Sequence, residues 1–153
     1  MKIAIITANT EEYKEKKESA AAAAIQRIVK QVGFQVVFNA TLPEDQTMLE
    51  TVMNRLIDGK LVDVIVTTGS TGVTKKDCVP EATLNVIEKQ IPGIPEAIRA
   101  YNIRYSKRTI LDRSVAGVKN ETLVVNLPDT PKLVQESLEY VLPELVHVVD
   151  MMK

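Results

Sequence analysis

The stretch VTTGSTGVTKKDCVPEA, from Val66 to Ala82, decides how this chain folds. A short β-branched run precedes two glycines three positions apart, and two lysines, an aspartate and a Pro-Glu pair follow. The β-branched run is typical of a buried strand, and Pro80 followed by an acidic residue is typical of a helix start. The stretch therefore predicts a strand, a glycine-containing turn and a helix, in that order.

The same alternation extends over the first half of the chain. Lys2–Thr7, Phe34–Thr41 and Val62–Thr68 are short apolar runs that predict strands buried in a sheet. The composition of Glu11–Val32 is helical, and an apolar stripe at helical spacing runs from Met48 to Ile57. Strands that alternate with helices indicate βαβ units. We expect an α/β fold of three layers, with a mostly parallel sheet covered by helices on both faces.

The second half is expected to complete the sheet and cover it. Pro80 to about Gln90 predicts a helix, and Asp112–Leu127 predicts two strands or a hairpin that turns near Lys119–Glu121. A last helical pattern covers Lys132–Met151. We expect this helix to be bent or divided at Pro143, because proline removes an internal hydrogen bond.

Length and composition limit the class of protein. A chain of 153 residues suits one domain, residues 1–153, and 19 Lys+Arg against 20 Asp+Glu give no general attraction to nucleic acid or anionic membranes. The single cysteine, Cys78, excludes an intramolecular disulfide. The longest purely apolar run, Ala20–Ile25, is far shorter than a membrane span, and MKIAIITANT is typical of a strand rather than a secretory signal. We expect a cytoplasmic protein without nucleic-acid or membrane partners.

Three segments are predicted to meet at one edge of the sheet. Parallel α/β sheets bind ligands beyond the carboxyl ends of their strands, where Asn9–Thr10, Gly69–Asp77 and Pro128–Pro131 should lie. Gly69 and Gly72 permit a tight turn whose N–H groups point outward toward an anion. Glycine-containing turns of this kind are also common as purely structural features, so both interpretations stay open on the residues alone. Hydroxyl groups add donors to the same turn, on Thr68, Ser70 and Thr71.

Carboxylates follow the turn. Asp77 and Glu81 flank Pro80, so that Glu81 lies in the first helical turn and Asp77 just before it. Such residues either stabilise the helix start or supply oxygen ligands to Mg²⁺. Cys78 lies beside lysines that could lower its pKa, but no base is matched to it, which favours an inert thiol.

Five motifs together resemble the molybdenum-cofactor biosynthesis proteins of the MogA/MoaB type. In chain order they are TTGSTG (67–72), KKDxxPEA (75–82), PGIPEAIR (92–99), LxRxxAG (111–117) and TLVVNLPxxP (122–131). The resemblance implies a molybdopterin-binding α/β fold that forms a homotrimer or a hexamer. It also implies the Mg²⁺-dependent transfer of AMP from ATP to the terminal phosphate of molybdopterin, so that a phosphorylated pterin and a nucleotide are the partners.

The resemblance assigns roles by position. Gly69–Gly72 would surround the pterin phosphate. Asp77 would be catalytic and hold Mg²⁺ together with Glu44, and Asp45, displaced by one position, is the alternative to Glu44. The other positions expected at the ligand are Thr68, Glu81, Ser114, Pro128 and Thr130.

Several positions depart from the family pattern. Ser70 and Asp129 replace glycines, Lys76 replaces an arginine and Val79 replaces a threonine. An aspartate beside a phosphate site repels the phosphate by about 1 kcal/mol. These departures favour an alternative, a non-catalytic molybdopterin- or nucleotide-binding or assembly module. A third hypothesis is that the scaffold binds another phosphorylated nucleotide or pterin.

Overall fold

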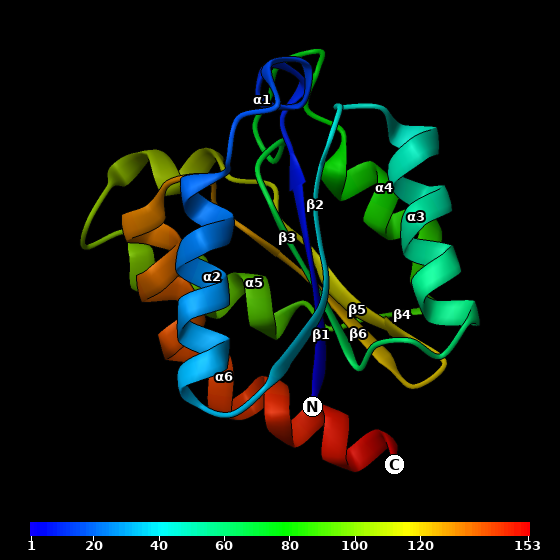
Figure 1. The fold of residues 1–153 in the computed structure, drawn as a ribbon. Helices are drawn as coiled ribbons and strands as arrows, with labels where there is room; N and C mark the ends of the chain where they lie inside the picture. The colour runs from blue at the N-terminus through cyan, green and yellow to red at the C-terminus, as the bar shows by residue number, and fades with distance from the viewer.

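A single six-stranded sheet organises the computed structural model, which describes residues 1–153 (Figure 1). The strand order is β2-β1-β3-β6-β5-β4; the first four strands are parallel, and β5 and β4 are antiparallel to their neighbours. The predicted mostly parallel sheet is therefore confirmed. The strands are β1 (Lys2–Ala8), β2 (Gln35–Leu42), β3 (Val64–Thr68), β4 (Lys89–Gln90), β5 (Ala116–Lys119) and β6 (Thr122–Leu127).

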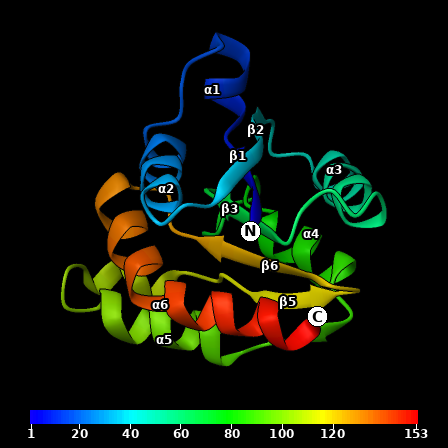
Figure 2. The ribbon, with the colours of Figure 1, turned by 60° about the horizontal axis from the view of Figure 1, so that its bottom comes forward.

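Helices cover both faces of the sheet, which confirms the three-layer architecture (Figure 2). They are α1 (Thr10–Glu15), α2 (Ala20–Gln31), α3 (Gln46–Asp58), α4 (Val79–Val86), α5 (Gly93–Asn102), the 3₁₀ helix η1 (Lys107–Leu111) and α6 (Pro131–Met152). α2, α5 and α6 pack on one face, and α3 and α4 pack on the other. None of the helices combines the length and the apolar character that crossing a bilayer requires.

The burial of the central strands explains why their sequences are continuously apolar. Ile3 and Ile5 of β1 belong to the core under α2, α5 and α6, whereas Ala4 and Ile6 belong to the core under α3 and α4. Side chains alternate between the two faces of a strand, and both faces of β1 are buried. An apolar side chain is therefore needed at nearly every position.

The direction in which successive strands are added to the sheet reverses between the neighbouring strands β1 and β3. The crossover from β1 to β2 carries α2 over one face, and the crossover from β2 to β3 carries α3 over the other face. In open α/β sheets such a reversal leaves a crevice beyond the carboxyl ends of the two strands. The fold therefore places the ends of β1 and β3 at the preferred position for a ligand.

The predicted helical segment Glu11–Val32 consists of two helices. Lys16 ends α1 in the left-handed conformation, with φ of 53°. Ser19 then starts α2, because its side chain accepts a hydrogen bond from the backbone N–H of Ala22 at 3.0 Å. The break lets α1 stand apart from α2 at the top of the molecule (Figure 1).

Other boundaries also differ from the prediction. α4 ends at Val86 rather than near Gln90, because Lys89–Gln90 pairs with β5 as the edge strand β4. The predicted turn between β5 and β6 is confirmed at Asn120, whose φ is 54°. α6 is continuous through Pro143 and is not divided, and its first and last portions run in different directions, as the expected bend requires (Figure 1).

Candidate functional site

A pocket of about 260 Å³ lies at the carboxyl ends of β1 and β3. The three segments predicted to meet there all contribute to it, through Asn9, through Gly69, Ser70 and Asp77, and through Asp129 and Pro131. The start of α2 and the loop before α3 complete the lining with Ser19 and Glu44. Residues that are far apart in the chain are thus brought together by the parallel strands.

The turn after β3 has free backbone donors. Gly69 has φ of +89°, and a Cβ atom there would lie 2.7 Å from the carbonyl oxygen of Ala8, so only glycine fits. Ser70 follows with φ of 59°. The backbone N–H groups of Ser70, Thr71 and Gly72 donate to no backbone acceptor in the protein. Successive free N–H groups in such a turn form a concave site for an anion.

Glu44 is held at the pocket by bonds to both of its oxygens. Oε1 accepts from the backbone N–H of Thr10 at 3.3 Å, and Oε2 accepts from Oγ of Ser70 at 3.1 Å. Oγ of Ser70 in turn accepts from the backbone N–H of Cys78 at 3.0 Å. The side chain of the serine that replaces a glycine therefore holds a carboxylate of the pocket in place.

Asp77 lies under the end of the turn. Its Oδ2 accepts from the backbone N–H and from the hydroxyl of Thr74, both at 2.8 Å. A Cβ atom on Gly72 would lie 2.8 Å from the same oxygen, so Gly72 is needed for the carboxylate to approach. Oδ1 of Asp77 accepts no hydrogen bond from the protein.

The lining of the pocket is acidic. Four carboxylates line it, and no lysine or arginine does; they belong to Glu12, Glu44, Asp77 and Asp129. Four like charges around a small volume repel an anion unless a cation joins it. The pocket therefore favours a phosphate group only in company with a cation.

On its far side the loop is clamped by Arg113. The guanidinium donates to the carbonyl oxygen of Gly72 at 2.6 Å and to the two carboxylate oxygens of Glu81 at 2.5 and 3.3 Å. These hydrogen bonds lower the pKa of Glu81. Thr71 adds a second tie, because its hydroxyl donates to Asp112 at 2.7 Å. Glu81 and Thr71 thus hold the protein together rather than face the pocket.

The remaining predicted residues divide between the pocket and its supports. Thr68 lines the pocket, and its hydroxyl also donates to the carbonyl oxygen of Pro128 at 2.5 Å. Asp45 and Thr130 cap α3 and α6 by accepting from backbone N–H groups of the first turns, and neither lines the pocket. Ser114 is buried outside the lining, and its hydroxyl has no partner.

Thr7, near the end of β1, is a pocket residue that was not predicted from the sequence. Its side chain lines the pocket and is 4% exposed, and its hydroxyl makes no hydrogen bond. A buried hydroxyl without a partner is unfavourable, so this threonine is a candidate for contact with a ligand. Threonine near the end of a strand is ordinary, so no sequence signal distinguishes this position.

Cys78 does not have the lowered pKa that neighbouring lysines could have given it. Burial raises the pKa of its thiol, and the nearby carboxylates of Glu44 and Glu81 raise it further. The interpretation of an inert thiol is therefore favoured by its surroundings.

Asn126 of β6 connects the sheet to the helix that follows the loop. Its side-chain amide donates to the hydroxyls of Thr67 and Thr83 at 2.9 and 3.0 Å. Its oxygen accepts from the backbone N–H of Val115 at 3.0 Å. The three hydrogen bonds of this buried side chain therefore link β6 to β3, to α4 and to the residue before β5.

Comparisons with known proteins agree with this arrangement. The family described as "Probable molybdopterin binding domain" matches residues 4–147. The chain is 37% identical over 108 residues to a molybdopterin adenylyltransferase of Helicobacter pylori, which is 71% of this chain and 61% of that protein. The protein of the same name from Escherichia coli K12 is 34% identical over 98 residues, 64% of this chain and 50% of that protein. The chain thus spans about half to three fifths of these relatives.

Solved structures are similar over nearly the whole chain. The molybdopterin biosynthesis enzyme MoaB from Thermus thermophilus superposes with a TM-score of 0.90 at 32% identity, covering 99% of this chain and 95% of that one. The molybdopterin biosynthesis Mog protein from Mycobacterium ulcerans gives a TM-score of 0.93 at 27% identity, with 99% of each chain covered.

Proposed function

Because this chain belongs to the family of probable molybdopterin binding domains, we propose that it transfers AMP from ATP to the terminal phosphate of molybdopterin. An oxygen of the pterin phosphate forms a bond to the α-phosphorus of ATP, the bond from that phosphorus to the oxygen bridging to the β-phosphorus breaks, and pyrophosphate leaves. The names of the bacterial relatives support this activity. The observation that carries it is one pocket lined by Gly69 and Ser70, which begin a turn with free backbone donors, and by the two carboxylates of Glu44 and Asp77.

The turn residues would bind the phosphate that reacts. The N–H groups of Ser70, Thr71 and Gly72 are free to donate to phosphate oxygens, and Ser70 lines the pocket itself. Phosphoryl transfer depends mainly on positioning and on neutralising charge, so no protein nucleophile is required. The hydroxyl of Thr7 is a further donor in the same pocket.

Mg²⁺ fits the chemistry of the lining. Glu44 and Asp77 offer carboxylate oxygens, which this ion prefers. Mg²⁺ usually binds through one or two carboxylates together with substrate phosphates, so no larger set of protein ligands is required. When bound, the ion would neutralise phosphate charge in a pocket that has no basic side chain.

A non-catalytic binding module is the second candidate. The hydrogen bond from Ser70 to Glu44 occupies one oxygen of a proposed metal ligand. Asp129 adds a negative charge to the lining. Both features suit a protein that holds the pterin without adenylylating it.

An assay of product formation separates the two functions. The purified protein is incubated with molybdopterin, ATP and Mg²⁺, and adenylylated pterin and pyrophosphate are measured. Asp77→Asn keeps an oxygen that accepts from Thr74 but loses the charge, and we expect at least about a 100-fold loss of rate. Asp150→Asn, on the exposed side of α6, is the charge-matched control. Pterin binding without product supports the module, and no binding of pterin contradicts both functions.

In the same proposal, the protein forms a homotrimer or a hexamer in the cytoplasm. Each of its chains is a single domain. Large apolar side chains are exposed around α5, η1 and α6, at Ile103, Tyr105, Ile110, Leu111 and Tyr140. Exposed apolar patches of this kind are typical of protein interfaces. Light scattering on wild type and on Ile110→Asp tests the assembly, and a monomeric wild type would contradict it.

A further inference from the structure

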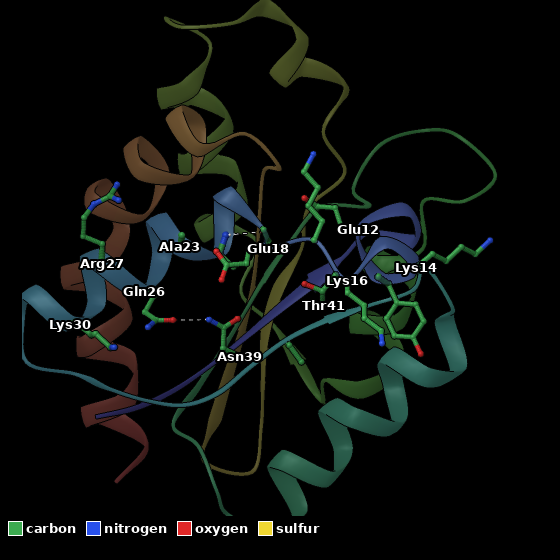
Figure 3. Close-up of a pocket in the computed structure, with 15 residues that line it drawn as sticks. Glu12, Lys14, Lys16, Glu18, Ala23, Gln26, Arg27, Lys30, Asn39 and Thr41 are labelled. Carbon is green, nitrogen blue, oxygen red and sulfur yellow. Dashed lines mark hydrogen bonds between the residues drawn. The ribbon is translucent and has the colours of Figure 1, made fainter.

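A second, larger hollow adjoins the pocket. This groove of about 940 Å³ lies between the α1–α2 segment and β2, which is an edge strand of the sheet. It shares Glu12 and Ser19 with the acidic pocket, so that the two hollows lie side by side. A hydrogen bond of 2.7 Å from Asn39 to Gln26 crosses its floor, with Lys16 toward one end and Arg27 and Lys30 toward the other (Figure 3).

The groove is basic although the chain has a net charge of −1. Five cations line it against two carboxylates, Glu12 and Glu18. None of the five makes an ion pair with a protein carboxylate. The cations are Lys14, Lys16, Lys17, Arg27 and Lys30.

The break between α1 and α2 creates this arrangement. Lys16 adopts a left-handed conformation at the end of α1, and the chain then turns at Lys17 to enter α2. A continuous helix would have extended this lysine run away from Arg27 and Lys30. The break instead places cations from both helices around one hollow.

The acidic pocket alone is too small and too negative for two polyanionic substrates. Its volume of about 260 Å³ falls below the roughly 300–1,000 Å³ usual for a single drug-sized ligand. A nucleotide and a phosphorylated pterin together must extend beyond it. The adjoining groove offers both the room and the positive charge.

We propose that the basic groove binds the polyphosphate of the nucleotide while its α-phosphate lies in the acidic pocket. This inference rests on the proposed adenylyl transfer and assigns the groove to the triphosphate and to the departing pyrophosphate. Unpaired cations beside the pocket also raise the local concentration of a polyanion. A small polyphosphate fits better than an acidic peptide because the groove borders the pocket in which the reacting phosphate of the nucleotide would lie.

Binding of inorganic tripolyphosphate to the full chain, measured by calorimetry without metal, tests the groove. The double variant Lys16→Gln/Lys30→Gln should weaken binding about tenfold and reduce its salt dependence. The control Lys89→Gln/Lys107→Gln makes the same charge change on exposed residues outside the groove and should change binding less than about twofold.

Because no metal or pterin is present, the result does not depend on whether adenylyl transfer occurs. Equal loss in the two double variants would show attraction by charge alone and overturn the inference. No binding by the wild type, or tighter binding of an oligoglutamate peptide than of tripolyphosphate, would also overturn it. Loss confined to the groove variant supports the groove even if no adenylylated pterin is formed.

Discussion

On the side of the β3–α4 loop that faces residues 112–117, polar side chains are bonded to one another. Arg113 joins Gly72 and Glu81, and Thr71 joins Asp112. The backbone N–H groups of Ser70, Thr71 and Gly72 have no backbone acceptor, and the hydroxyl of Thr7, which lines the pocket beside this loop, has no partner. We call the bonded groups the closed side and the free groups the open side of the loop; Asn126 and its partners belong to the closed side.

The difference in hydrogen bonding indicates a separate role for each side of the loop. A closed network fixes the shape of the loop, because each donor finds its acceptor within the protein. Unsatisfied groups at the open side are unfavourable on their own and become favourable when a ligand satisfies them. The closed side therefore stabilises the conformation in which the open side is ready for an anion.

The largest effect is expected at Asn126. Asn126→Ala leaves the hydroxyls of Thr67 and Thr83 and the N–H of Val115 without their partner and opens a small cavity. We expect the free energy of unfolding to fall by about 2–4 kcal/mol. Urea unfolding at one protein concentration measures it.

The exposed Asn85 provides the control, because its amide donates only to Glu50 on the surface. Asn85→Ala should change the free energy of unfolding by less than about 0.5 kcal/mol. Similar losses in the two variants would mean that the buried network contributes nothing particular to the closed side.

A smaller effect is expected at Arg113. Arg113→Gln removes the paired hydrogen bonds to Glu81 and weakens the bond to Gly72, so that the loop loses its fixed shape. We expect adenylyl transfer to fall about tenfold to 100-fold while the protein stays folded. Steady-state rates and circular dichroism check both parts. Arg104→Gln is the control, since the Arg104 side chain donates only to the backbone carbonyl of Tyr101, near the end of α5.

An unchanged rate in Arg113→Gln would contradict the role given to the closed side, because its hydrogen bonds would then not be needed for the open side to bind its ligand. A rate lowered equally by Arg104→Gln would attribute the loss to surface charge.

Much of this fold can be predicted from the sequence because burial on both faces of parallel strands leaves a clear apolar signal. Lys2–Ala8 and Val64–Thr68 show it. β4 carries no such signal, because Lys89 and Gln90 are exposed and join the sheet only through backbone pairing with β5. The break at Lys16 was also hidden, since lysine is a good helix former and its left-handed conformation depends on the cap.

The position of the pocket was predictable because polar residues follow the ends of parallel strands. Glu44 and Asp77 lie at the pocket as expected, whereas Asp45 accepts a hydrogen bond from the first turn of its helix and Glu81 pairs with Arg113. Residue type alone does not tell a ligand-facing carboxylate from a structural one, because the same oxygens serve both. The two kinds of carboxylate are told apart only by where the folded chain places their hydrogen-bond partners, which come from distant segments.

The open side can be tested at Thr7 with little effect on stability. Thr7→Val removes a hydroxyl that has no partner in the protein, so the free energy of unfolding should stay level or rise by up to about 1 kcal/mol. Affinity for ATP with Mg²⁺ should fall about threefold to tenfold. Thr7→Ser keeps the hydroxyl and should bind like the wild type. A valine variant that is less stable yet binds normally would assign the hydroxyl to the closed side.

The smallest effect concerns pH and the pair of Glu81 and Arg113. Hydrogen bonds from Arg113 lower the pKa of Glu81 below its ordinary value of 4.5 in the folded protein, and Glu81 raises the pKa of Arg113. The guanidinium therefore stays charged in acid. A carboxyl whose pKa is lowered by folding stabilises the protein above its unfolded pKa, and that stabilisation is lost as pH falls through the folded value.

Because the side chain of Glu81 is 43% exposed, the pair should contribute only about 0.2–1 kcal/mol. Urea unfolding between pH 6 and roughly pH 3 should therefore show that wild type and Glu81→Gln differ above the unfolded pKa and converge as pH falls. Glu139→Gln, an exposed glutamate on α6, should give a curve parallel to that of the wild type. A constant difference between wild type and Glu81→Gln at every pH would mean that packing of the side chain, rather than its charge, holds this end of the closed side.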